Sequence, residues 1–347
     1  MQLQSSLSGS RIDASPVDEN PLDLHQAFGD IKAKLATSAS LTFRLGRQEF
    51  LYGSQRLVAV REGPNNRQSF DAVRSLFISG NYQVDFFYGH HVATKKKIFD
   101  DGFNKNTKLW GVYMVRNKLP VLKNVDLYYL GLWKRQTSFD DGQGKELRHS
   151  IGSRIWNNEG DWKYDIEALY QFGKLAGKTI GAWTTSANTS YRFSKARLKP
   201  ELGLKTELIS GDKNYDDYKL QTFNPLFPRG AYFGLAALIG PANLIDVHPS
   251  LSLSVAKKLE LGFDYDIFWR YSRNDGLYGV NASLIYSGRN VTSKFIGDQP
   301  AFNLTYIPNN FLTFTAEFTW FDAGSYLKEA GAGKDILFTG ITTQLKF

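Results

Sequence analysis

The sequence contains no cysteine and only 2 methionines among its 347 residues. The absence of cysteine excludes disulfide bonds, thiolate metal sites and cysteine nucleophiles together. Long apolar runs are also absent, because the longest candidate, 231–240, stops at Pro241, whereas a transmembrane helix needs about 20 apolar residues. The first residues lack the basic start and the apolar stretch of a secretory signal. We expect that a signal was removed or that the beginning of the gene product is missing.

Apolar and aromatic residues are plentiful, at 42% and 14% of the chain, which excludes a disordered protein. The formal net charge is +8. The basic residues of the chain are spread over alternating positions of the expected strands and do not gather in one patch, so nucleic acid is not an expected partner. The run Lys95-Lys-Lys97 lies in an expected long loop, where it is either simply solvated or able to meet anionic lipopolysaccharide.

Apolar and polar residues alternate along most of the chain. In the segment 259–271 the odd positions from Leu259 to Tyr271 are apolar or aromatic, while the even positions include Glu260 and Asp264. A period of two predicts strands with one apolar and one polar face. We predict an all-β fold with strands at 22–35, 40–50, 68–79, 81–91, 107–118, 123–135, 147–156, 161–173, 178–193, 198–210, 247–256, 259–271, 295–307, 310–321 and 336–347.

These strands are longer than the roughly 5–6 residues usual in globular proteins, and they reach the roughly 9–11 residues that cross a bilayer. Short connections alternate with long ones at 51–67, 92–106, 136–146, 211–246 and 272–294. Short turns on one side and long loops on the other are typical of an outer-membrane β-barrel whose short turns are periplasmic. We therefore predict one transmembrane antiparallel β-barrel domain over residues 1–347, in the outer membrane of a Gram-negative bacterium.

The predicted strands number fifteen, whereas bacterial barrels close with an even number. Residues 2–7 resemble the tail of one further strand, so that about 15–16 strands are present and the chain is expected to begin inside a strand. In this interpretation 1–21 is a remnant strand with its loop, and 22–347 holds the other strands. The alternative is a sixteen-stranded barrel with a short first strand.

The polar faces of the strands should line the lumen. They carry both charge signs and many arginines, which points to a water-filled channel for an anionic passenger. The alternative is that arginines and carboxylates pair across the wall as struts and select nothing. The strand pattern places these charged side chains inward: Arg44, Arg148, Arg154, Arg192, Lys205, Asp165, Glu167, Glu207, Asp264, Asp266 and Arg270. The strand 68–79 is ambiguous, since Arg74 shares its face with Phe70 and Leu76.

The loop 211–246 contains Phe223, Pro225, Phe227 and Arg229 and is too apolar to lie free in water. We predict that it folds over or into the mouth of the barrel as a gate. The five histidines have no metal-ligand spacing, and no Ser–His arrangement suits catalysis, because His149 and Ser150 point to opposite faces of a strand. No metal, cofactor or catalytic residue is predicted.

Short segments occur in a specific order along the chain: Leu24-His-Gln-Ala-Phe28, Leu41-Thr-Phe-Arg-Leu-Gly-Arg-Gln-Glu-Phe50, Tyr52-Gly-Ser-Gln-Arg-Leu57, Arg67-Gln-Ser-Phe-Asp-Ala-Val-Arg74, Arg148-His-Ser-Ile-Gly-Ser-Arg154, Tyr170-Gln-Phe-Gly173, Ser210-Gly-Asp212, Thr222-Phe-Asn-Pro-Leu-Phe-Pro228, Phe268-Trp-Arg270 and Asp275-Gly-Leu-Tyr278. From about residue 20 to the C-terminus the set resembles the alginate export family of outer-membrane β-barrels. The terminal Phe347, with Leu345 and Ile341, resembles a barrel-assembly signal.

The resemblance implies a parent barrel of eighteen strands, whose basic lumen passes an anionic uronate polysaccharide and is gated by loops. It implies lipopolysaccharide, outer-membrane lipids and periplasmic export components as partners. Carried onto this chain, its basic positions are Arg44, Arg47, Arg74, Arg148, Arg154 and Arg270, with Asp71, Asp165, Glu167 and Asp264 as acidic partners. Two alternatives remain open: a general or organic-acid porin on the same barrel and, with least support, a barrel enzyme.

Overall fold

A computed structural model describes residues 1–9, 17–62 and 65–346. Its architecture is one large sheet of 17 strands. A short strand, β1 (Gln2–Ser6), is followed by the long strands β2 (Asn20–Ala36), β3 (Ala39–Gln48), β4 (Phe70–Ser79), β5 (Tyr82–Ala93), β6 (Gly102–Leu119), β7 (Lys123–Phe139), β8 (Gly142–Asn157), β9 (Trp162–Leu175), β10 (Lys178–Arg192), β11 (Glu201–Ile209), β13 (Leu244–Ala256), β14 (Leu259–Arg270), β17 (Phe295–Asn309), β18 (Leu312–Ala323) and β19 (Ile336–Leu345).

Each of these strands pairs antiparallel with the next one in the chain, from β1 to β11 and then through β13, β14, β17, β18 and β19. The two-residue β12 (Lys219–Leu220) adds to β10 in parallel. A separate hairpin joins β15 (Leu277–Tyr278) to β16 (Leu284–Tyr286). This up-and-down order confirms the predicted all-β barrel architecture.

All fifteen predicted strands are present, and residues 2–6 form the short additional strand. The largest differences are at β6 and β8, which begin at Gly102 and Gly142 instead of 107 and 147. The prediction was wrong there because these strands continue into polar residues, such as Lys105 and Gln143, beyond the apolar band that the alternation reports. The predicted long loop 136–146 is consequently a tight turn. The eighteen-stranded parent stays a prediction, and Phe347 lies outside the described residues.

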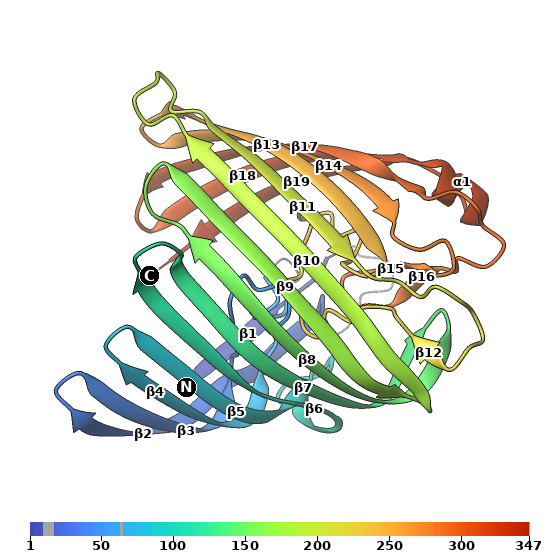
Figure 1. The fold of residues 1–347 in the computed structure, drawn as a ribbon. Coiled ribbons are helices and arrows are strands. Elements are labelled where there is room, and N and C mark those ends of the chain that lie inside the picture. The colour runs from blue at the N-terminus through green and yellow to red at the C-terminus, as the bar shows by residue number, and fades with distance from the viewer. Residues whose placement is uncertain (10–16, 63–64, 347) are drawn as a thin grey trace.

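The long loops lie at one end of the strands (right in Figure 1), as predicted, and most tight turns lie at the other end. Two tight turns, between β7 and β8 and between β9 and β10, lie at the long-loop end, so the predicted alternation of short and long connections is wrong there. The long-loop end carries β12, β15, β16 and one short helix, α1 (Ser325–Ala330), which the sequence pattern did not indicate. Within the part of the chain that the structure describes, none of the helical segments has the length and apolarity that a membrane crossing requires.

The two faces of the sheet follow the alternation. Phe43 and Leu45 are exposed on the outer face of β3, while Arg44, between them, points the other way toward Asp30 of β2. The main buried apolar cluster lies inside the barrel and includes Phe50, Phe70, Phe87, Phe223, Phe227 and Phe268. Six of its members belong to the 210–243 loop, namely Phe223, Leu226, Phe227, Tyr232, Phe233 and Ile239, so this loop folds inward and brings its own apolar core.

This inner core resolves the ambiguous strand β4. Phe70 and Arg74 both face inward, because Phe70 stacks on Phe50 with ring centroids 4.9 Å apart and Arg74 donates to Asp85 of β5 at 2.7 Å. An inward phenylalanine is stable there because an infolded loop covers it, so the simple rule that apolar residues face lipid does not hold for this strand.

Candidate functional site in the lumen

Two long loops enter the barrel and pair with each other there. In the 49–69 loop, Ala59 donates its backbone N–H to the carbonyl of Phe227 at 2.9 Å, and the N–H of Phe227 donates to the carbonyl of Leu57 at 2.9 Å. The Arg229 N–H donates to the carbonyl of Gln55 at 3.1 Å. These bonds form a short parallel bridge between Val58 and Phe227. The infolded body is therefore built from both loops, of which only the second was predicted to fold inward.

Arg56 attaches this body to the barrel wall. Its guanidinium donates to Glu207 of β11 at 3.0 Å, to Glu167 of β9 at 3.1 Å and to Thr184 of β10 at 3.0 Å. A further contact, of 2.9 Å, reaches the hydroxyl of Tyr232 in the 210–243 loop. Arg56 was not among the predicted site residues, although the family-like segment 52–57 contains it.

Glu167 and Glu207 face the lumen as predicted, and each is also held by other groups. Tyr128 donates to Glu167 at 2.6 Å, and Tyr232 donates to Glu207 at 3.0 Å. The ammonium of Lys205 lies 3.5 Å from Glu207 and above the rings of Tyr232 and Phe233, at 5.0 and 4.5 Å from their centroids. The predicted lumen residues Glu167, Glu207 and Lys205 therefore serve partly to hold the infolded loops in place.

Most of the predicted lumen arginines are paired with carboxylates on the same strand or on a neighbouring one. The N–O distances are 2.7 Å for Arg44–Asp30, 2.6 Å for Arg148–Glu146, 2.7 Å for Arg154–Asp165 and 3.6 Å for Arg192–Glu201. Arg154 makes a second bond to Asp126 at 2.9 Å. These contacts are the wall struts of the alternative interpretation, and they leave such arginines little charge for a passing solute.

Arg148 and Arg270 are fully buried. Arg148 donates to Gln171 at 2.8 Å and to the carbonyl of Thr222 at 3.2 Å. Arg270 donates to the carbonyls of Val291 at 3.0 Å and Arg273 at 2.9 Å in the 271–294 loop. Both arginines anchor long loops, and neither presents its guanidinium to an open pore.

Arg47 and Asp71 were predicted to lie along the substrate path, and the structure contradicts this. They are register partners and pair at 2.8 Å. Their neighbours Phe70 and Ala72 point inward to the core, so Asp71 and Arg47 share the outer face with Val73, which is exposed. The two positions came from the family resemblance and have the opposite strand parity to Arg44.

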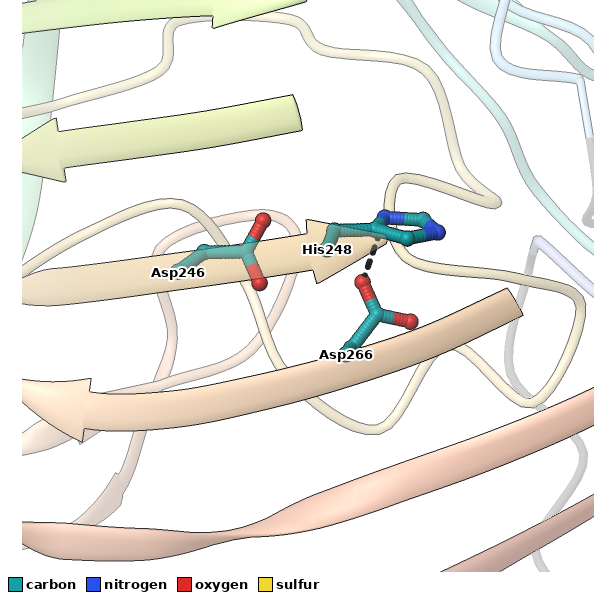
Figure 2. A group of neighbouring side chains, drawn as sticks. All are labelled: Asp246, His248 and Asp266. Carbon is teal, nitrogen blue, oxygen red and sulfur yellow. Dashed lines mark ion pairs between the residues drawn. The ribbon is translucent and has the colours of Figure 1, made fainter. Parts of the chain in front are cut away.

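A histidine lies between carboxylates on β13 and β14. His248 Nδ1 is 2.7 Å from Asp266, and its Nε2 is 3.0 Å from Asp264. Asp246 lies on the same strand as His248, is 1% exposed and has no hydrogen-bond partner among the described residues. Figure 2 shows Asp246 and His248 on one strand and Asp266 on the next. This group, together with Asp23–Asp100–Asp101 and Asp141–Asp212–Asp217, has ligand atoms close enough to hold a cation.

The predicted gate residues lie in the infolded loop, which separates two cavities. Leu226, Phe227, Pro228 and Gly230 line an outer cavity of about 530 Å³ at the long-loop end. Arg229 and Tyr232 line an inner cavity of about 120 Å³ together with Arg56 and Lys205. Phe223 and Pro225 are buried in the loop's own packing. The segment 226–232 therefore stands across the lumen, in the position expected of a constriction.

A third cavity, of about 580 Å³, opens at the tight-turn end. Arg154, Lys163, Asp165 and Glu201 line it, together with polar Asn188 and Ser190. It shares Asp165 and Asn188 with the inner cavity, so these two are adjacent. The hydrophilic space thus leads from the tight-turn end to the segment 226–232.

Acidic groups also connect the long loops to one another. Asp275 accepts bonds from Thr222 at 2.6 Å and from the backbone N–H of Asp212 at 2.7 Å. Burial raises the pKa of Asp275 to about 6. Burial, followed by the negative charge of Asp275, raises the pKa of Asp212 to about 7. This contact between the 210–243 and 271–294 loops therefore carries a charge that depends on pH in the neutral range.

A family model described as alginate export matches residues 1–335. Among curated proteins, none matches the sequence at a significant level. The fold is similar to Pseudomonas aeruginosa OccD3 (OpdP), with a TM-score of 0.55, 13% identity and coverage of 94% of this chain and 78% of that one. It is also similar to P. aeruginosa OccK2 (OpdF) in complex with glucuronate, with a TM-score of 0.52, 10% identity and coverage of 90% and 79%. A third similar structure is a BenF-like porin from Pseudomonas fluorescens Pf-5, with a TM-score of 0.50, 9% identity and coverage of 90% of this chain and 75% of that one.

Proposed function

Because this chain belongs to the alginate export family, whose barrels cross the outer membrane of Gram-negative bacteria, we propose that it is a passive channel for acidic saccharides. In this proposal residues 1–347 act as one channel domain. The passenger is a uronate or a chain of uronates, drawn by basic side chains and released because carboxylates alternate with them. Anionic lipopolysaccharide surrounds its outer end.

The observation that carries this proposal is the position of segment 226–232 in the lumen. Segment 226–232 lies between the outer cavity and the inner cavity, and cations occur on both sides of it: Arg61 and Lys134 outside, Arg56 and Lys205 inside. A low-dielectric, narrow passage strengthens the effect of such charges on a passing anion. OccK2, which shares this fold, has been crystallised with glucuronate, and a solute of that class suits the charges described here.

A second candidate is a porin for small organic acids. The observation in its favour is the size of the inner cavity, about 120 Å³, together with the pairing of most lumen arginines. A polymer would need the infolded loops to move aside, whereas a single small acid would need only local rearrangement.

The experiment is a reversal-potential measurement in a planar bilayer with a KCl gradient, followed by swelling of liposomes in glucuronate and in glucose. We expect a reversal potential of the anion-selective sign and faster swelling in glucuronate. A cation-selective pore that passes glucose and glucuronate equally would refute the proposal. Swelling in acetate, a smaller acid, separates the two candidates, since an organic-acid porin should pass acetate much faster than glucuronate.

A further inference from the structure

Two cations in the lumen differ from all the paired arginines. Arg61, in the 49–69 loop, donates to the neutral side chain of Gln68 at 2.7 Å. Lys134 of β7 faces the ring of Phe227, 5.7 Å from its centroid. Among the described residues, neither Arg61 nor Lys134 has a carboxylate within ion-pair distance. A cation that is withdrawn from water without a counter-charge is costly to the fold, so it calls for an explanation.

The nearest carboxylate to Lys134 is already engaged. Glu146 is the register partner of Lys134, but it accepts from Arg148 at 2.6 Å and from the amide of Asn224 at 3.1 Å. Burial lowers the pKa of Arg61 to about 10, with no acidic neighbour to oppose this. The group therefore remains charged at neutral pH and lacks a partner.

Both cations line the outer cavity of about 530 Å³, a volume within the roughly 300–1,000 Å³ typical of small-molecule sites. Its other walls are of two kinds. Phe227, Leu238 and Val280 offer apolar surface, while Asn281 and Ser283 offer polar groups that can bond hydroxyls. Two cations beside an apolar wall and hydroxyl-binding groups match a sugar acid, which has one carboxylate, one flat ring face and several hydroxyls.

The residues of this site are held in place by Gln68 and by the bridge between the two infolded loops. Gln68, which contacts Arg61, donates to the carbonyl of Ala59 at 2.7 Å and is oriented by the bridge between the two infolded loops. Phe227 forms part of that bridge and stacks on His91 with ring centroids 5.2 Å apart. Arg61 and Phe227 therefore keep a fixed relative position, and a ligand pays little for ordering them.

We propose that Arg61 and Lys134 form a carboxylate-binding subsite for a uronate residue on the long-loop side of the constriction. The inference deepens the proposed function and rests on it, since it assigns the contact between channel and solute to these two unpaired cations instead of the paired arginine rows. In this arrangement the paired arginines stabilise the barrel wall, whereas Arg61 and Lys134 bind the anion next to segment 226–232.

The test is equilibrium binding of sodium D-glucuronate, with D-glucose as the neutral probe, to the full chain in detergent micelles by isothermal titration calorimetry. Arg61→Gln and Lys134→Gln are each expected to weaken glucuronate binding about ten- to a hundredfold, the size of one lost charged hydrogen bond. The control is Lys105→Gln, which removes the same charge from an exposed position of β6 at the same end of the barrel.

If Arg61 and Lys134 had a purely structural role, the two variants would unfold at a lower temperature than the parent. Arg61 and Lys134 are partly buried and unpaired, so replacing either one removes a desolvation cost, and both variants should unfold at the same temperature as the parent or higher. Unchanged glucuronate affinity in both variants, with binding intact in the parent, would overturn the subsite and leave the channel function standing. A parent that is anion-selective yet does not bind glucuronate would also overturn the subsite, whereas a parent that is not anion-selective would refute the proposed function itself.

Discussion

The contacts of Arg56 allow one prediction to be worked through quantitatively. The variant Arg56→Ala removes the bonds from the infolded body to Glu167, Glu207 and Thr184. Breaking a buried ion pair costs about 3–5 kcal/mol when a carboxylate is left alone. Glu167 keeps Tyr128, and Glu207 keeps Tyr232, so the lower limit of about 3 kcal/mol applies.

A change of about 3 kcal/mol shifts the equilibrium between seated and released loops roughly a hundredfold. The strands should stay folded, since their ladders do not involve Arg56. The assay is backbone amide exchange by mass spectrometry on the detergent-solubilised protein, which should show residues 51–62 exchanging up to about a hundredfold faster. Single-channel recordings should show larger, noisier conductance. The control is Arg197→Ala in the exposed turn after β10. Equal protection of 51–62 in Arg56→Ala and in the parent would refute the role of Arg56 as the anchor.

Three further predictions concern the loops and the outer face. The fold raises the pKa of both carboxyls, so it favours their protonated forms. The contact between Asp212 and Asp275 is therefore strongest in acid, weakens as the pH rises toward about 7 and changes little above that pH. Amide exchange in 211–220, corrected for intrinsic rates, should be slower at pH 5 than at pH 8, and Asp212→Asn should remove the difference. In Gly240→Ala the new Cβ would lie 2.0 Å from the carbonyl oxygen of Gly279. This clash should destabilise the contact between the 210–243 and 271–294 loops by about 1–3 kcal/mol and speed protease cleavage within 230–240. Unchanged cleavage would contradict the prediction. Arg47→Gln should leave the reversal potential unchanged, because Arg47 lies on the outer face.

The strands could be predicted because lipid imposes a period of two that each strand shows by itself. Strand β14 is an example: its alternation from Leu259 to Arg270 appears in the sequence and again in the structure. The alternation of apolar and polar residues failed as a guide where the strand does not separate lipid from a water-filled lumen. The start of β8 lies beyond the apolar band, and Phe70 faces an inner core that only the folded loops create.

The site could be predicted only in part, because its contacts join residues far apart in the chain. Arg56 bonds Glu207 across 151 positions, and nothing near residue 56 indicates that partner. The inward carboxylates followed from strand parity. Which cations are paired and which are free depends on distances across the lumen, so Arg61 and Lys134 were not identified. His248, between Asp264 and Asp266, was missed because ligand spacing along one strand does not reveal partners on the next.

Block of single-channel current by oligouronates tests the central claim most directly. The full chain is placed in a planar bilayer, and a short oligouronate or a neutral oligosaccharide of equal length is added on the long-loop side. We predict current interruptions whose frequency rises with oligouronate concentration and falls with increasing salt, and few with the neutral sugar. A channel that both oligosaccharides block equally, or that neither enters, would contradict an electrostatically selective path for acidic saccharides.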